Sequence, residues 1–383
     1  MKKQYWMALM AGALVSAGCG TDPLEESRAK PVMERYAALV NENYTDMVTK
    51  ARELRTAVEA FVADPTEAKL TAARTAWLAA RPAYGQSEAF RFYGGPIDDE
   101  ETGPEGRINS WPLDESYIDS VVGSPEAGII NATTQFPTIT EDVLASANER
   151  DGETNIATGY HAIEFLLWGQ DQSVTGPGNR PATDFVDGGT APNAARRREY
   201  LKLVTDLLVK DLESVQTQWT PGADNYGKKF TALTPKEAVQ RMLTGMGALS
   251  GAELSGERMR VAYDNKDQED EHSCFSDNTL ADLHANALGI QNVYLGRYGD
   301  KDGAGLDELV AKVDPELDTK MKQQLQASLD AIQAIPGPFD QAILGADNSP
   351  GRQKVKAAIA ALQAQTETLV DVATALGIEL NLE

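Results

Sequence analysis

The strongest chemical signal in this sequence is an imidazole and a carboxylate three residues apart, at His161 and Glu164. Residues three apart in a helix share one face, so both side chains could reach a single metal ion. The residues around them, from Tyr160 to Trp168, are apolar on nearly every side, which predicts a buried helix. A buried carboxylate needs a partner. The spacing alone therefore leaves open a metal site or a satisfied pair of core side chains.

Two protein ligands do not complete a metal site, because an iron or zinc centre needs four to six. Other ligands would have to come from distant acids, and the candidates in the first half of the chain are Glu88, Asp98, Glu105 and Asp114. Each of these acids could equally be a solvated side chain of a loop. Arg91 and Arg258 could orient such carboxylates or neutralise an anionic ligand, and a simple ion pair is the alternative.

The remaining histidines and the second cysteine give weaker signals. His272 and Cys274 form another pair of metal-ligating types, but the acids at residues 269–271 favour an exposed loop. His284 falls inside a predicted helix, where a packed or half-exposed histidine is ordinary. Three histidines in the whole chain nearly exclude a histidine-rich zinc centre. The H-x-x-E-H peptidase motif would need histidine where Phe165 stands.

Apolar residues at spacings of three and four predict helices over most of the chain. We expect them at 31–61, 66–84, around His161, and at 201–219, 235–263, 278–294, 315–335 and 352–376. No segment alternates in the manner of a strand. The expected fold class is all-α, with two packed helical-bundle domains and long irregular loops. A boundary near residue 195 gives an N-terminal domain over 31–195 and a C-terminal domain over 196–383.

The first residues predict export. Lysines followed by an apolar stretch at residues 5–15 are typical of a signal peptide, expected over residues 1–18. The Ser-Ala-Gly-Cys sequence ending at Cys19 resembles the lipobox of bacterial lipoproteins, in which the cysteine is acylated. Residues 19–30 would then form a tether, and the lipid anchor would be the only membrane contact. Secretion without an anchor is the alternative.

The charge balance restricts the partners. Asp and Glu total 58 against 35 Lys and Arg, a formal charge of -23. Nucleic acid would be repelled over most approaches, so cations are the better candidates. Much of the acidity could simply keep an exported protein soluble.

The G-x-H-x-x-E sequence at Gly159, His161 and Glu164 resembles the signature of imelysin-like proteins. The stretches at 81–100 and 105–115, RPAYGQSEAFRFYGGPIDDE and EGRINSWPLDE, resemble the region that precedes this signature in the family. Two later stretches, GERMRVAYDN at 256–265 and EHSCFSDNTLADLHANALGIQNVYLG at 271–296, look like the iron-regulated protein A branch.

This resemblance implies an exported, all-helical, two-domain protein with a metal site at the motif, a link to bacterial iron uptake and a peptidase label. We predict a lipid-anchored protein of the cell envelope that binds iron, or zinc as the alternative, or a metal-bearing ligand at the domain interface. An envelope iron-transport or haem protein is the expected partner. A metallopeptidase using the same site and a metal-free partner-docking protein are the competing hypotheses.

Overall fold

The computed structural model describes residues 23–382. Within this range the chain is helical without a single named strand, and the only β-pairing is two isolated bridges. The predicted all-α class is therefore confirmed, and each expected helical segment overlaps an observed helix. The predicted signal peptide and Cys19 lie outside the described residues.

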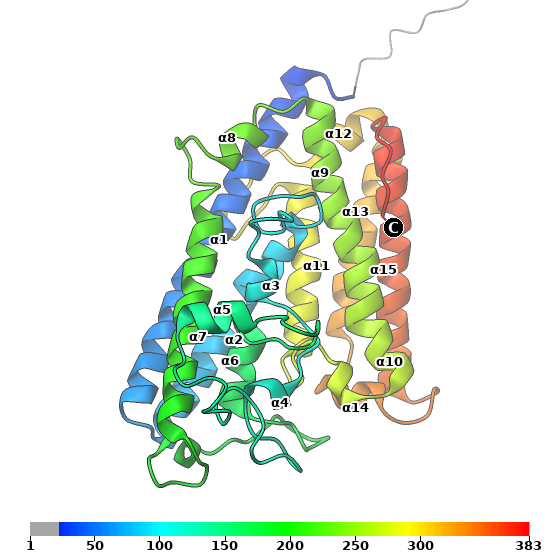
Figure 1. Cartoon of the computed structure of the whole chain (residues 1–383). Helices are drawn as coiled ribbons and strands as arrows, with labels where there is room; N and C mark the ends of the chain where they lie inside the picture. Colours follow the sequence, from blue (N-terminus) through cyan, green and yellow to red (C-terminus); the bar gives the residue numbers. More distant parts are fainter. Residues whose placement is uncertain (1–22, 383) are drawn as a thin grey trace, which may run out of the picture.

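The first group of helices contains the G-x-H-x-x-E motif, which lies in α6 (Figure 1). It consists of α1 (Glu26–Ala63), α2 (Glu67–Ser87), α6 (Gly159–Trp168) and α7 (Ala194–Thr217). Helices α1 and α2 pack along each other, and α7 packs against both α1 and α6. The domain boundary near residue 195 stays a prediction, and α7, which begins there, belongs by its contacts with the first group.

The second group lies beside the first in Figure 1. Its helices are α9 (Pro235–Ala248), a π-helix (Leu249–Val261), α10 (Ala262–Asn265), α11 (Thr279–Leu295), α12 (Leu306–Val313), α13 (Pro315–Gln333) and α15 (Pro350–Ala375). Helix α11 packs against α2 on one side and α13 on the other, so it joins the two groups.

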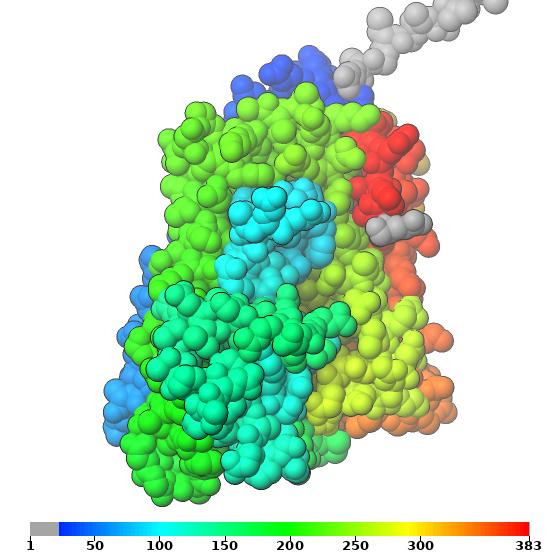
Figure 2. Space-filling model, viewed as in Figure 1, coloured from blue at the N-terminus to red at the C-terminus, as the bar shows by residue number. Residues whose placement is uncertain are grey.

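The connecting loops contain short helices. They are the 3-10 helices Glu88–Phe90, Ala182–Phe185 and Gln268–Asp270, and the α-helices α3 (Glu105–Ile108), α4 (Glu115–Ile118), α5 (Glu141–Ala147), α8 (Tyr226–Phe230) and α14 (Phe339–Ile343). Figure 2 shows part of the long loop region after α2, in cyan, on the molecular face between the two groups.

Two boundaries differ from the sequence prediction. Helix α1 begins at Glu26 rather than Pro31, which lies within its second turn. Leu24 is already buried, so the C-terminal part of the predicted tether belongs to the fold. The expected helix over 235–263 is continuous, but most of its second half, residues 249–261, forms a π-helix. A hydrophobic pattern cannot distinguish this wider turn from an α-helix over so short a length.

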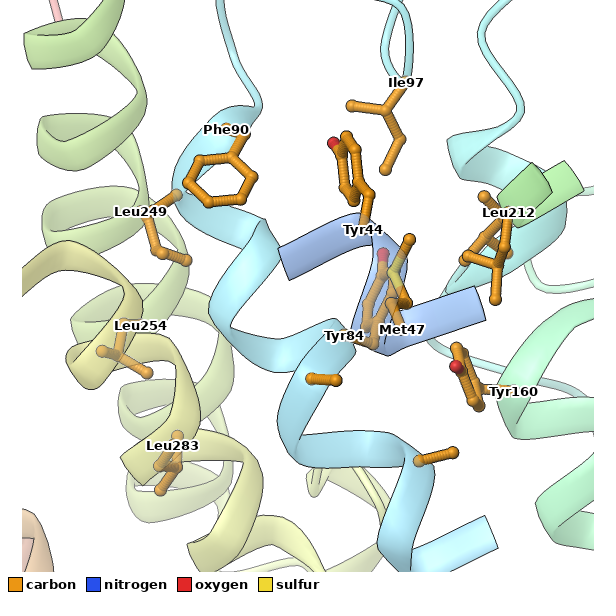
Figure 3. Packing of buried hydrophobic residues seen from close by; sticks show 14 of the residues in the cluster. Tyr44, Met47, Tyr84, Phe90, Ile97, Tyr160, Leu212, Leu249, Leu254 and Leu283 are labelled. Carbon is orange, nitrogen blue, oxygen red and sulfur yellow. The ribbon is translucent and has the colours of Figure 1, made fainter. Parts of the chain in front are cut away.

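One apolar core runs through both groups. Figure 3 shows Tyr84 of α2 beside Met47 of α1, with Leu249 and Leu254 of the π-helix and Leu283 of α11 on the other side of α2. The two groups therefore bury their apolar faces against each other as well as within themselves.

Glycines allow α2 and α11 to approach closely. A Cβ atom on Gly289 would lie 2.3 Å from the main-chain oxygen of Gln86, and one on Gly85 would lie 2.7 Å from the Cβ of Ala285. Neither distance is sterically allowed, so both positions require glycine. Close packing of these backbones fixes the distance between the two groups.

We predict that Gly289→Ala lowers the free energy of unfolding by about 1–2 kcal/mol, because overpacking outweighs the gain in helix propensity. Urea denaturation measures the effect. Gly176→Ala is the matched control, since no heavy atom lies within 4 Å of its added Cβ, and it should change stability by less than about 0.5 kcal/mol. Equal stabilities of the two variants would contradict the close approach.

Candidate functional site

Helix α6 presents the motif from the centre of the molecule. All ten of its residues are buried. Gly159 begins the helix with a φ of +87°, and a Cβ there would lie 2.5 Å from the main-chain oxygen of Ile108. Glycine is therefore the residue that fits both the backbone conformation and the available space. This contact sets the start of α6 against the segment that continues into Asn109.

His161 and Glu164 contact each other directly. His161 Nδ1 lies 2.8 Å from Glu164 Oε2. The other carboxylate oxygen, Oε1, accepts hydrogen bonds from the backbone N–H and the hydroxyl of Ser276, at 3.0 and 2.7 Å. Both oxygens of Glu164 are thus engaged within the protein. The carboxylate is placed to orient the imidazole rather than to extend with it toward a common ion.

The second ring nitrogen of His161, Nε2, is buried and has no hydrogen-bond partner. The His161 ring packs edge-on against His272, with ring centroids 4.8 Å apart, and in a tilted arrangement against Trp111, with centroids 5.0 Å apart. His272 Nε2 in turn lies 3.4 Å from the amide nitrogen of Asn109. Two imidazoles therefore meet at this point, one of them with an unused nitrogen.

The expectation of an exposed loop at His272 and Cys274 is wrong, because residues 271–276 are buried. Polar contacts hold the segment inside: Ser276 donates to Glu164, and Ser273 donates to Asp282 on α11. The acids at 269–271 gave no sign of these partners in the sequence, because Glu164 and Ser276 become neighbours only in the folded chain. Cys274 is buried and does not line the cavity described below.

Burial dominates the protonation of the site. It lowers the pKa of His161 and of His272 well below 6.5, and the positive charges of Arg81 and Arg258 add to the effect. Burial also raises the pKa of Glu164 to about 8, against the opposing hydrogen bonds from Ser276. Both imidazoles are therefore neutral at pH 7. One proton lies in the hydrogen bond between His161 Nδ1 and Glu164 Oε2, and the tautomer of His161 determines which of the two groups donates it.

Glu88 lies at the centre of a buried ion network. Arg91 and Arg258 donate to the same oxygen of Glu88, at 2.7 and 2.8 Å. Burial would raise the pKa of Glu88, but the two arginines lower it to about 2. Arg91 also pairs with Glu105 at 2.9 Å. The predicted role of both arginines in orienting carboxylates agrees with this geometry. Glu88 is engaged by the two arginines.

A cavity of about 330 Å³ opens beside this network. His272 and Trp111, the two rings that contact His161, form part of its wall. The π-helix contributes side chains four residues apart, which aligns one face of this helix with the cavity. The lining residues are Arg91, Glu105, Asn109, Ser110, Trp111, Pro112, Glu253, Glu257, Arg258, Val261, Asp270 and His272.

Two of the predicted acids lie elsewhere. Asp98 accepts hydrogen bonds from the backbone N–H groups of Phe92 and Gly95, so it stabilises its own loop. Asp114 is exposed and caps α4. Neither lines the cavity. His284 is exposed on α11.

The structure adds site residues that the sequence did not indicate. Arg81 is buried, donates twice to Asp282 at 3.1 Å and donates to Asn109 at 2.6 Å. Asn109 and Trp111 lie in the EGRINSWPLDE stretch, whose resemblance to the family was the only available signal. No sequence pattern pointed to Ser276, because serine is common in loops.

The residues present fit part of a metal site. An unused histidine nitrogen beside a second neutral imidazole is suited to iron, zinc or copper. However, no three His, Cys, Asp or Glu side chains between residues 23 and 382 converge as a ligand set. The protein alone therefore supplies an incomplete coordination shell, and water or a ligand would have to complete it.

Comparison with known proteins assigns the chain to a family. The sequence matches the Imelysin family over residues 40–369. The chain belongs to the imelysin family. It is 26% identical to iron-regulated protein A of Synechococcus elongatus over 338 residues, which cover 85% of this chain and 80% of that protein. The predicted membership of the imelysin family is thereby confirmed.

Solved structures show the same fold. A crystal structure of a protein assigned as an iron-regulated protein A precursor from Parabacteroides distasonis matches with a TM-score of 0.73 and 24% identity, covering 94% of this chain and 97% of that one. An imelysin-like protein from Psychrobacter arcticum matches with a TM-score of 0.62 and 14% identity, covering 93% and 97%. No described helix combines the length and apolar character that a membrane span requires.

We predict that the two buried histidines make stability fall at acid pH. Their folded pKa values are depressed, so below pH 6.5 the unfolded chain binds protons that the folded chain does not. Each histidine should then reduce the free energy of unfolding by about 1.4 kcal/mol per pH unit. In denaturant titrations between pH 6.5 and 4.5, the loss of unfolding free energy per pH unit should be smaller in His272→Gln than in the parent, by about 1.4 kcal/mol.

His284→Gln is the control, because His284 is exposed and should leave the slope unchanged. A His272→Gln slope equal to that of the parent would show that His272 is not held neutral in the fold.

Proposed function

We propose that this imelysin family protein binds a transition-metal ion as cargo, with iron as the first candidate, beside His161 and His272. The observation that carries the proposal is the buried, unpartnered Nε2 of His161 next to a second neutral imidazole. A neutral imidazole offers a lone pair to a metal at pH 7, which a protonated one cannot. The similarity to a protein named iron-regulated protein A supports iron.

In this proposal Glu164 does not bind the metal but positions His161, which does. Once Glu164 has lost its proton, its Oε2 can accept the Nδ1–H of His161, and that tautomer leaves Nε2 free for the metal. This differs from direct coordination by both side chains, because Glu164 has both oxygens engaged by His161 and Ser276. Glu105, which lines the cavity, and water are the remaining candidates for ligands.

The charges of the cavity favour a cation. Four acids line it, namely Glu105, Glu253, Glu257 and Asp270, against two arginines, Arg91 and Arg258. Both arginines already pair with Glu88, so little positive charge remains for an anionic ligand. The net charge of the chain, -23, extends the same attraction over a longer range.

We also propose a lipid anchor at Cys19 and a location in the cell envelope. The Ser-Ala-Gly-Cys sequence supports acylation, and the acidity of the chain argues against nucleic acid as a partner. An iron-transport or haem protein of the envelope is the partner that this function would require.

The geometry supports a peptidase less well. A metallopeptidase needs a carboxylate free to activate water, and both oxygens of Glu164 are held in hydrogen bonds within the protein. Phe165 also stands where the H-x-x-E-H pattern would place a second ligand. A binding protein requires neither group.

Metal binding by the full chain, stripped with a chelator and titrated anaerobically with Fe²⁺, tests the proposal. We expect about one ion per chain by equilibrium dialysis and elemental analysis, with zinc and copper compared. His161→Ala and His272→Ala should each weaken binding by at least ~100-fold, more than the loss of an outer-shell partner. His284→Ala serves as the control. Undiminished binding by His161→Ala would overturn the site.

The affinity should also depend on pH. Glu164, with a pKa of about 8, must lose its proton before its Oε2 can accept the Nδ1–H of His161 and leave Nε2 free for the metal. The affinity should therefore rise about tenfold per pH unit from pH 6 to 8 and then level off. In Glu164→Gln we expect a roughly 10–100-fold lower affinity that is flat over this range. An unchanged pH slope in Glu164→Gln would exclude this coupling.

A further inference from the structure

A second and larger cavity, which we call the α6 cleft, lies at the C-terminal end of α6 and has a volume of about 810 Å³. Its wall is drawn from three loop segments: 120–126 after α4, 168–180 at the end of α6, and 184–192 before α7. Helix α4 lies at the lower end of the molecule in Figure 1. The α6 cleft shares no lining residue with the cavity beside His272, so it is a separate surface.

Apolar side chains are strongly exposed around the α6 cleft. Val122, which lines it, is 76% exposed, and Val174, between the lining residues Ser173 and Pro177, is 51% exposed. Among residues 23–382 these two are the most exposed of the large hydrophobic side chains. Trp168 lines the same cleft. Isolated exposed valines are ordinary, but two of them beside a tryptophan-lined cleft indicate a surface that a ligand covers.

The charge of the α6 cleft selects the sign of that ligand. Glu126, Asp171 and Asp184 line it, and within residues 23–382 none of the three forms an ion pair. Arg180 is the one base among the described lining residues, and it donates to Asp119 at 2.6 Å, so its charge is compensated. Acids gathered in a cleft attract an oppositely charged ligand, so the occupant is cationic.

Arg180 adds a demand for a hydrogen-bond acceptor. The residue is 8% exposed, and its Nε is buried without a hydrogen-bond partner. A Cβ atom on the lining residue Gly169 would lie 3.4 Å from this nitrogen, so the absence of a side chain at Gly169 leaves space beside the donor. A guanidinium N–H needs an acceptor oxygen, which a bare cation cannot supply.

We propose that the α6 cleft binds an extended, cationic peptide segment of a partner protein. Such a segment brings all three groups that the cleft calls for: basic side chains for the acids, apolar side chains for Trp168 and Val122, and a main-chain carbonyl for Arg180 Nε. Its length also suits a cleft walled by three loops. This inference names the chemistry of the partner in the proposed function, but peptide binding itself does not require metal at His161.

The α6 cleft is hydrogen-bonded to the segment that carries His272. The backbone N–H of Gly178 donates to the main-chain oxygen of Phe275 at 2.9 Å, and Gln268 Nε2 donates to the main-chain oxygen of Asp171 at 2.9 Å. The loop after α6 therefore contacts the bound peptide on one side and the 271–276 segment on the other. A partner docked here lies next to the proposed metal site.

Fluorescence anisotropy of the full chain with a labelled, end-capped decapeptide of repeating lysine, valine and proline tests the proposal. Proline keeps the probe extended, and the three-residue repeat places lysines on one side of the polyproline II helix and valines on another. We expect saturable one-to-one binding with a Kd below about 1 mM that weakens as salt is raised. The same peptide with glutamate in place of lysine should not bind.

Glu126→Gln/Asp184→Asn should weaken binding at least ~10-fold, because it removes two of the three acids. Val122→Ser should weaken it about 5-fold through the loss of apolar contact.

The matched controls are Asp142→Asn/Glu367→Gln, which removes the same charge from exposed positions on α5 and α15, and Val370→Ser, which alters an exposed valine of α15. Both controls should bind like the parent. Equal binding by the two double variants would show that the peptide is held only by net charge, and it would overturn the α6 cleft as the site. So would a parent chain that binds no peptide at 1 mM.

The two sites can be separated experimentally. His161→Ala should bind the peptide with the affinity of the parent, and Glu126→Gln/Asp184→Asn should retain Fe²⁺ binding at one ion per chain. A failure of iron binding would therefore leave the peptide result unaffected.

Discussion

The structure depends on the need to satisfy one buried carboxylate. Glu164 lies on a helix with no exposed residue, so its oxygens must find donors inside the protein. His161 supplies one hydrogen-bond partner from the same helix, and Ser276 supplies two donors from a loop more than a hundred residues later. This requirement draws the 271–276 segment, which contains His272, into the core and places the two imidazoles side by side.

Polar groups that bridge the two helix groups surround this carboxylate. Arg81 of α2 reaches Asp282 of α11, and Arg258 of the π-helix reaches Glu88. Such buried pairs need close, well-defined geometry to offset the loss of hydration. The glycine contacts between α2 and α11 supply that geometry, because they bring the backbones close enough for the side chains to meet. Packing and electrostatics therefore depend on each other here.

The environment of the cavity is mixed, because carboxylates there accompany neutral imidazole and arginine. Such a combination of side chains suits a transition metal held by nitrogen.

The sequence by itself determined the all-α class, the positions of the long helices and the family, because helix periodicity and the G-x-H-x-x-E motif are local patterns. It also identified His161, Glu164, Glu88, Glu105 and the two arginines as residues of interest. Only the tertiary structure decided that Glu164 supports His161, that Asp98 and Asp114 lie apart, and that His272 is buried. These outcomes depend on contacts between residues distant in the chain, such as Ser276 with Glu164, and no local pattern encodes them.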